Sequence, residues 1–149
     1  MRYLRISAII AASALFVACG GDSPTDPSAG DGGDAATPRT VLAEPSFAAN
    51  VNEILQRRGC ATSGCHGSGA GGLRLTSAAS DNYAALVGVA AIAEDFDYVV
   101  PNDATNSYLV IKIENRQSVG QRMPLGSSEL DSIDQTNIRN WINNGAPNN

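Results

Sequence analysis

The stretch RRGCATSGCHGSG (57–69) contains two of the three cysteines in the chain and its only histidine. Four small residues separate Cys60 from Cys65, and His66 follows directly. Two thiols and one imidazole at this spacing can hold a prosthetic group or a metal ion, or the thiols can pair with each other. The rest of the chain decides between these uses.

The pattern C-x4-C-H is a lengthened form of C-x-x-C-H, the signature of covalent haem attachment. Attachment needs two thiols that add to the vinyl groups along one edge of the porphyrin, and an imidazole beside them that reaches the iron. His66 directly follows Cys65, and the small spacer residues can bulge outward without collision. The sequence therefore predicts one haem c, attached through Cys60 and Cys65, with His66 as an axial iron ligand.

Three other interpretations use the same residues. A disulfide between Cys60 and Cys65 suits an oxidising compartment, but it leaves His66 without a role. A zinc site needs a fourth ligand, and the sequence has no second histidine and no further cysteine pair. Redox chemistry of a thiol pair favours the shorter C-x-x-C spacing. The disulfide is the main alternative to haem.

Met123 is the candidate ligand for the other face of the iron. Once Met1 leaves with a signal segment it is the only methionine, and it lies in the Gly- and Pro-bounded loop GQRMPLG (120–126). A thioether is a soft ligand that suits haem iron, and Met/His ligation raises the reduction potential. The alternative is that Met123 fills a gap in the core. Lys112 or an exogenous molecule is the fallback ligand.

The N-terminus has the features of an export signal. Two arginines in MRYLR (1–5) precede an apolar run (6–17) that is too short to span a bilayer but suits a signal peptide. The residues ending at Cys19 resemble the lipobox of bacterial lipoproteins, in which the matching cysteine is acylated. That resemblance implies a signal peptide over 1–18 and a lipid anchor at Cys19. An ordinary signal peptide, with Cys19 left as an odd thiol, is the alternative.

The same resemblance places the protein in the cell envelope of a Gram-negative-type bacterium, on the periplasmic side, and Gly20 favours the outer membrane. Without Arg2 and Arg5 the chain keeps 8 of its 10 basic residues against 15 acidic ones, a formal charge of −7. Such a charge argues against binding to nucleic acid or to anionic lipid, and it is compatible with a basic protein partner.

Composition divides the rest of the chain into a tether and one domain. The segment 20–40 is Gly, Ser, Pro and Asp with almost no apolar content, which predicts a flexible tether over 19–42 that includes the lipidated cysteine. Residues 43–149 suit one small domain. Its six aromatic residues and long glycine-rich loops predict that a large bound group helps to stabilise it.

Apolar periodicity predicts a mostly helical domain with long loops. The first helix begins at Ser46 as N-cap and ends at Gly59. The segments 80–88 and 107–115 predict two short helices, although the β-branched run YLVIKI (108–113) equally suits a strand. The last helix carries one buried stripe, in which Asp134 is the polar exception; the stripe consists of Leu130, Asp134, Ile138, Trp141 and Ile142.

A helix, a cysteine–histidine cluster, a loop, a Met-Pro pair and a last helix together resemble a class I c-type cytochrome. More narrowly, GGLRL (71–75), VVPNDATNSYLVIKI (99–113), RMP (122–124) and WINNGA (141–146) resemble the planctomycete-type cytochrome c domain. The resemblance covers nearly all of 47–146. The four-residue spacer departs from the family pattern and leaves open whether one thioether forms or two.

This resemblance implies a cytochrome c-like helical domain wrapped around a covalent haem, with His66 as proximal ligand and Met123 as distal ligand. It places Pro101 in the wall beside the histidine, where a carbonyl can orient the imidazole. Arg74 and Arg122 are candidates for pairing with the haem propionates, or are plain solvated charges. Trp141 is expected to pack the last helix against the first.

An iron with a protein ligand on each face has no vacant position for a substrate, so we expect an electron carrier rather than an enzyme. Its partners would be other redox proteins, reached while the lipid anchor holds the domain near the membrane. Two alternatives stay open. One is a haem-based sensor or peroxidase-like module with an open distal position, and the other is a haem-free structural lipoprotein stapled by a disulfide.

Overall fold

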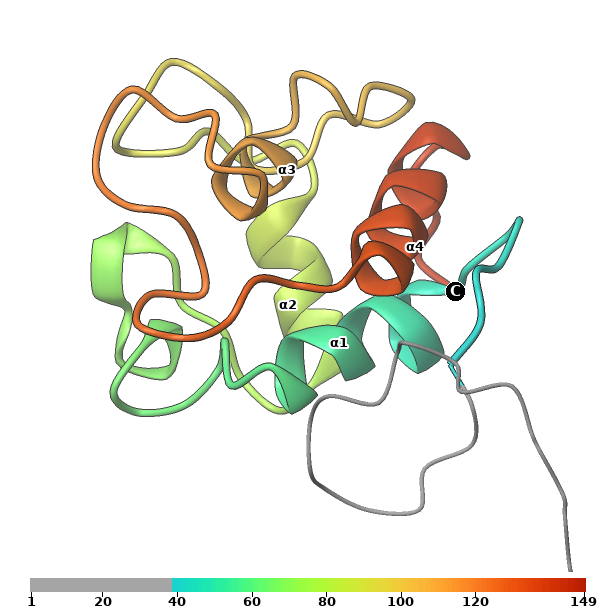
Figure 1. Ribbon diagram of the computed structural model, residues 1–149, viewed down its shortest axis with the longest axis horizontal. Coiled ribbons are helices and arrows are strands. Elements are labelled where there is room, and N and C mark those ends of the chain that lie inside the picture. The colour runs from blue at the N-terminus through green and yellow to red at the C-terminus, as the bar shows by residue number, and fades with distance from the viewer. Residues whose placement is uncertain (1–38) are drawn as a thin grey trace, which may run out of the picture. The chain divides into compact units, whose positions relative to one another are not determined.

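The computed structural model describes residues 39–149, so the expected signal peptide, Cys19 and the segment up to residue 38 lie outside the described residues. The described part folds into short helices joined by long loops and contains no β-strand (Figure 1). The helices are η1 (Phe47–Val51, a π-helical turn), α1 (Asn52–Arg57), the 3₁₀ turns η2 (His66–Ser68) and η3 (Ala70–Gly72), α2 (Ala79–Leu86), α3 (Tyr108–Ile113) and α4 (Ser132–Asn143). The prediction of a small, mostly helical domain is confirmed. None of the helices in this part of the chain is long and apolar enough to cross a membrane.

The first predicted helix is confirmed with both of its ends. Ser46 Oγ accepts a hydrogen bond of 3.2 Å from the Ala49 N–H, which satisfies a donor that the first turn leaves open. Gly59 takes a φ of +72°, a left-handed conformation that glycine adopts without steric cost and that ends the helix. The end of this helix therefore sets the position of Cys60, which begins the following turn.

The last helix packs against the first, as the sequence predicted for Trp141. The Trp141 ring lies 5.0 Å from the Phe47 ring, and Tyr83 of α2 contacts Phe47 edge-on at 5.3 Å. The buried Trp141 indole N–H donates to the Pro147 carbonyl at 3.0 Å. This aromatic cluster joins α4, η1 and α2, and none of its three side chains lines the cavity described below.

The predicted stripe of α4 is buried, and its polar member Asp134 is neutralised by arginine. Arg57, the last residue of α1, donates to both Asp134 oxygens at 2.8 and 2.9 Å. Arg39 donates to the same carboxylate at 2.9 Å. Only 2% of the Asp134 side chain is exposed, so burial of this charge depends on the two guanidinium groups.

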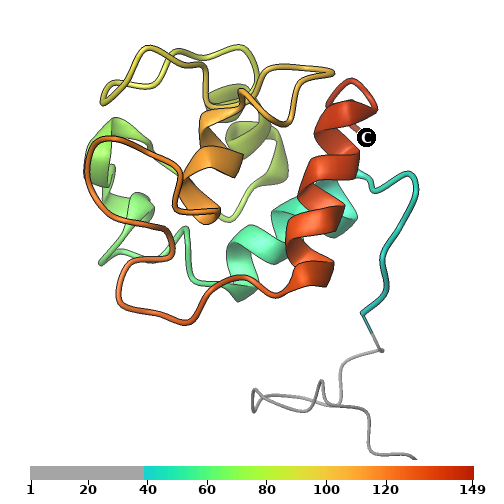
Figure 2. The ribbon, with the colours of Figure 1, turned by 45° about the horizontal axis from the view of Figure 1, so that its top comes forward.

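The folded part of the chain begins earlier than the sequence indicated. Residues 19–42 were expected to be tether, but Asn137, Asn140 and Asn144 of α4 hydrogen-bond the backbone of residues 40–43 through their side chains. The three asparagines share one face of the helix because they are three and four residues apart. Figure 2 shows this N-terminal segment running beside α4. Side-chain amides thus supply hydrogen-bond partners for the backbone of this segment.

The segment YLVIKI, which suited a helix or a strand, forms α3. Ser107 precedes it and fixes its start, since the Ser107 hydroxyl donates to the Asp103 carbonyl at 2.8 Å and accepts from the Val100 N–H at 2.9 Å. Glu114 at its end accepts from Arg139 of α4 at 2.6 Å. The helix is therefore attached to the domain at both ends.

Between α2 and α3 the chain makes an irregular hairpin over residues 87–99. Isolated β-bridges pair Val87 with Val99 and Ala90 with Asp97. The backbone amides of Tyr108 and Leu109, in the first turn of α3, donate at 2.9 Å to the carbonyls of residues 97 and 98. The base of this hairpin is thus fixed to α3, and its far end projects beyond the helix.

Removal of the Asp134 charge should destabilise the domain. We expect Asp134→Asn to lower the free energy of unfolding by about 2 kcal/mol, because the buried contact that joins α1 to α4 is lost, although Arg39 keeps its pair with Asp131 and Arg57 its pair with Glu53. Urea unfolding of the variant and the wild type measures this change. Glu129→Gln is the matched control: that side chain is 69% exposed and pairs with Arg122 at 3.5 Å, so we expect a loss below about 0.5 kcal/mol. Equal losses in the two variants would contradict this role of Asp134.

Candidate functional site

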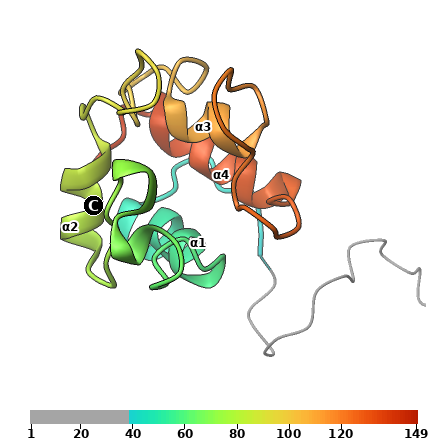
Figure 3. The same cartoon turned by 90° about the vertical axis from the view of Figure 1, so that its left-hand side faces the viewer.

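An apolar cavity of about 280 Å³ lies in this domain between α1, α3, the turns after Cys60 and the loop before α4. Its apolar wall includes Leu55, Leu73, Leu75, Leu86, Ile113 and Ile138. Cys60, His66 and Met123, which are far apart in the sequence, also line it. Figure 3 faces the side of the domain where the turns after Cys60 and the loop before α4 both lie. The structure thus brings three of the four main candidate residues to one cavity.

The segment from Cys60 to His66 forms a closed turn. The His66 N–H donates to the Cys60 carbonyl at 3.1 Å, so the two residues lie side by side although five residues separate them in the sequence. The spacer between them bulges outward, as the sequence suggested, and residues 62–65 are exposed. Cys65 lies in this exposed bulge and does not line the cavity.

Gly67 makes this closed turn sterically possible. Its N–H donates to the Thr62 carbonyl at 2.9 Å, which draws the bulge against the chain after His66. A Cβ at Gly67 would stand 2.4 Å from the Ala61 oxygen and 2.7 Å from the Thr62 oxygen. Real Cβ atoms do not approach backbone this closely, so only glycine fits here.

The two thiols have different surroundings. Both are free, and Cys60 is half-buried whereas Cys65 is exposed. Burial raises the pKa of the Cys60 thiol, since a thiolate is poorly solvated beside the apolar wall. Cys60 therefore stays protonated at neutral pH unless it is covalently modified.

The imidazole of His66 is oriented by a backbone carbonyl. His66 Nδ1 lies 2.9 Å from the Ala70 oxygen, which can only accept, so Nδ1 is the donor in this contact and Nε2 is the ring nitrogen left to bind another group. An unprotonated ring nitrogen is the form that binds a metal ion, with the other nitrogen held by a carbonyl. The sequence analysis expected Pro101 at this position, but Pro101 is exposed and does not line the cavity. Ala70 takes that place because η2 and η3 turn the chain back towards the ring.

Met123 is held by the backbone of α3. Its N–H donates to the Lys112 carbonyl at 3.0 Å, and its half-buried side chain lines the cavity with the following Pro124. The chain between α3 and α4 that carries it, residues 114–131, is called here the Met123 loop. Lys112, the fallback ligand, also lines the cavity, and burial lowers the pKa of its ammonium group.

The two arginines differ in their relation to the cavity. Arg74 is exposed between Leu73 and Leu75, and because neighbouring side chains of an extended segment alternate, it points away while the two leucines line the wall. Arg122 donates to the Ser127 carbonyl at 3.2 Å. Its Nη1 atom is buried and has no hydrogen-bond partner among the described residues. Neither Arg74 nor Arg122 lines the cavity, so the pairing of either arginine with a propionate stays a prediction.

These observations fit a haem. The wall is apolar, a thiol and an imidazole with a free Nε2 meet at one end, and a thioether lies in the same wall. They fit a zinc ion poorly, since no group of three or more His, Cys, Asp or Glu side chains in residues 39–149 could hold a metal ion.

The Ala70 carbonyl was not predicted from the sequence. No residue type marks a backbone carbonyl as a histidine partner, so its position depends on the path of the glycine-rich turns. No protein-family model, curated protein or solved structure matches this chain.

Substitution of Gly67 should open the turn that joins Cys60 to His66. We expect Gly67→Ala to cost about 1 to 3 kcal/mol of unfolding free energy, because the added methyl group overlaps two backbone carbonyls. Gly64→Ala is the control, since a Cβ at that exposed position has no atom within 4 Å and its expected cost is below about 0.5 kcal/mol. Urea unfolding compares the two variants, and a tolerated Gly67→Ala would show that the turn is not closed as described.

Proposed function

We propose that this protein is a monohaem c-type cytochrome that carries single electrons outside the cytoplasm. The observation that carries the proposal is the convergence of Cys60, His66 and Met123 on one apolar cavity. A bare structural domain has no need to place its only histidine and a thioether in the same apolar wall. A group with a large apolar surface and a metal centre accounts for both.

Each residue has a role in this proposal. Cys60 and Cys65 attach the porphyrin edge, and Cys60 already lines the cavity. His66 binds the iron through Nε2 while the Ala70 carbonyl holds Nδ1. Met123 binds the opposite face. Arg122 pairs with a propionate. The haem supplies an iron that changes oxidation state by one electron.

Ligands on both faces favour electron transfer over catalysis. With Met123 bound, the iron has no open position for oxygen, peroxide or substrate, which disfavours the sensor and peroxidase-like alternatives. The apolar wall excludes water and, together with thioether ligation, favours the reduced state and so raises the reduction potential. The disulfide-stapled alternative leaves the apolar cavity unexplained.

The lipid anchor at Cys19 and the tether belong to the same proposal. A lipid anchor at Cys19 would keep the domain close to the envelope membrane. Confinement to this layer raises the effective concentration for membrane-bound redox partners. The acidic composition favours partners with a basic docking face.

The mass of the purified protein tests the proposal directly. The full chain, made in a host that has cytochrome c maturation machinery, should be coloured and should keep the added mass of one haem after denaturation and reduction. Alkylation of the denatured protein then counts the remaining thiols and shows whether Cys65 also forms a thioether. Colourless protein at the bare peptide mass would exclude a covalent haem.

Replacement of Met123 tests the distal ligand. We expect Met123→Ala to change the visible spectrum and to lower the reduction potential, because the thioether stabilises reduced iron. Leu125→Ala is the control in the same loop; its side chain is 58% exposed, and it should leave both unchanged. An unaltered spectrum and potential in Met123→Ala would show that Met123 is not a ligand.

A further inference from the structure

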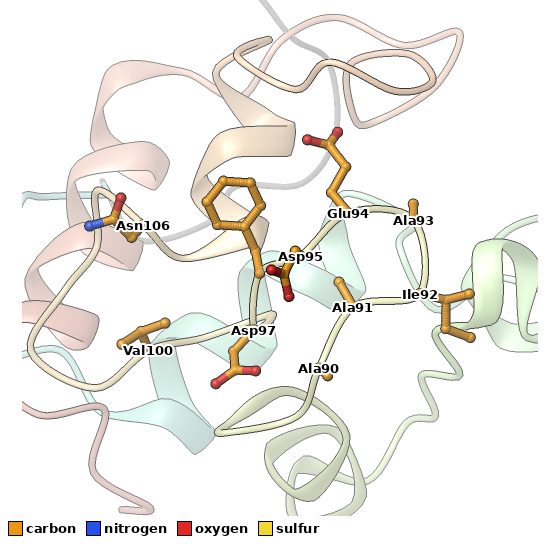
Figure 4. Close-up of a pocket in the computed structure, with 10 residues that line it drawn as sticks. Ala90, Ala91, Ile92, Ala93, Glu94, Asp95, Asp97, Val100 and Asn106 are labelled. Carbon is orange, nitrogen blue, oxygen red and sulfur yellow. The ribbon is translucent and has the colours of Figure 1, made fainter.

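Residues 92–94, at the far end of the hairpin 87–99, contact both sides of the cavity. Ile92 lies against Gly72 on the histidine side, where an added Cβ would stand 2.1 Å from Ile92 Cδ1. Ala93 lines the cavity itself. Glu94 reaches the Met123 loop on the other side. Figure 4 shows these side chains along a surface hollow and the Glu94 carboxylate pointing away from that of Asp97.

Glu94 binds the Met123 loop through several hydrogen bonds. Its Oε1 accepts from the backbone N–H groups of Ser118 and Val119 at 3.1 and 2.9 Å, and its Oε2 accepts from the Ser118 hydroxyl at 3.0 Å. Tyr108 of α3 donates to Oε1 at 3.3 Å. The bond from the Val119 N–H is the main cause that lowers the pKa of Glu94, so the carboxylate is ionised at neutral pH. Charge-assisted hydrogen bonds of this kind are among the strong ones in proteins.

The support behind Glu94 is rigid. The hairpin that carries it is closed by two bridges, and its base is hydrogen-bonded to the first turn of α3. Between residues 118 and 123 the Met123 loop is therefore held both by this hairpin and by α3, where the Lys112 ammonium also donates to the Val119 carbonyl at 3.4 Å. Glu94 holds residues 118 and 119, and the Lys112 carbonyl holds the Met123 N–H. Val119, Gly120 and Gln121 lie between these points, line the cavity and are exposed, so they form part of its mouth.

We propose that Glu94 is a positioning residue that keeps the Met123 loop closed over the cavity and thereby keeps Met123 on the iron. This inference rests on the proposed ligation by His66 and Met123. Glu94 does not touch the iron. It acts by restricting the loop, so that the thioether dissociates only when the hydrogen bonds to residues 118 and 119 break. Loss of this carboxylate leaves residues 118–123 attached to α3 by the Met123 N–H on the Lys112 carbonyl and by the Lys112 ammonium, which donates to the Val119 carbonyl at 3.4 Å.

The test uses the haem-loaded full chain and imidazole as the probe. Imidazole binds oxidised haem iron only after Met123 leaves, so its limiting binding rate reports loop opening. We expect Glu94→Gln to speed that rate about tenfold, because the amide keeps one acceptor and turns the other into a donor that faces the Ser118 hydroxyl. The reduction potential of Glu94→Gln should also fall towards that of Met123→Ala. Asp95→Asn, at the adjacent exposed carboxylate, is the control and should match the wild type.

Amide hydrogen exchange gives a second readout that does not depend on iron chemistry. The Val119 N–H should exchange about tenfold faster in Glu94→Gln than in the wild type. Should Glu94→Gln fail to fold, Ser118→Ala removes one bond from the loop side and should shift both rates in the same direction by a smaller factor.

The outcomes separate this inference from the proposed function. A wild type that binds imidazole as fast as Met123→Ala would overturn ligation by Met123, and this inference with it. The other outcome is that imidazole binds slowly to the wild type and fast to Met123→Ala. If Glu94→Gln then shows the wild-type binding rate and the wild-type exchange rate at the Val119 N–H, the role of Glu94 alone is overturned.

Discussion

The hydrogen bond from the His66 N–H to the Cys60 carbonyl is the constraint on which the rest of the site depends. It closes a turn across four spacer residues and so restores the adjacency that a two-residue spacer provides directly. The turn requires the left-handed Gly59 before it, which ends α1, and the tightly packed Gly67 after it. Because α1 is joined to α4 through Arg57 and Asp134, the position of this turn is fixed relative to the last helix.

The cavity and the core share residues, which links binding to stability. Leu55, Leu86 and Ile138 are buried in the core and also line the cavity. These side chains are almost fully buried, so they join the packed core to the more exposed residues of the cavity wall. A bound apolar group would cover accessible surface elsewhere on that wall and contribute about 25 cal/mol for each Å² removed from water. A chain with few aromatic residues and many glycine-rich loops gains proportionately more from such a group than a well-packed helical domain does.

The features that were predicted from the sequence are those set by residues close to one another along the chain. Periodicity and capping located the helices, since Ser46 and Gly59 act within one turn of their own positions. The burial of Asp134 within an apolar stripe was visible, and a charged partner was implied by physics although Arg57 was not named. Residues 40–42 were assigned to the tether because they follow a polar segment; their partners, asparagines of α4, are about a hundred residues away. The Ala70 carbonyl was missed for a related reason, since backbone groups carry no sequence label. The outward direction of Arg74 does follow from alternation with Leu73 and Leu75, and that signal was available.

Both candidate axial ligands are held by the main chain rather than by flexible side chains. The His66 ring is fixed by the Ala70 carbonyl, and the Leu75 N–H donates to the His66 carbonyl at 3.0 Å. Met123 is fixed by the Lys112 carbonyl, which belongs to a helix attached at both ends. Such supports restrict the ligands to small displacements, because moving either one requires a helix or a closed turn to shift with it. A metal centre held this way changes oxidation state with little structural rearrangement, and fast single-electron exchange requires that property. The same rigidity would hinder a sensor, whose ligand must leave readily when a signal molecule binds.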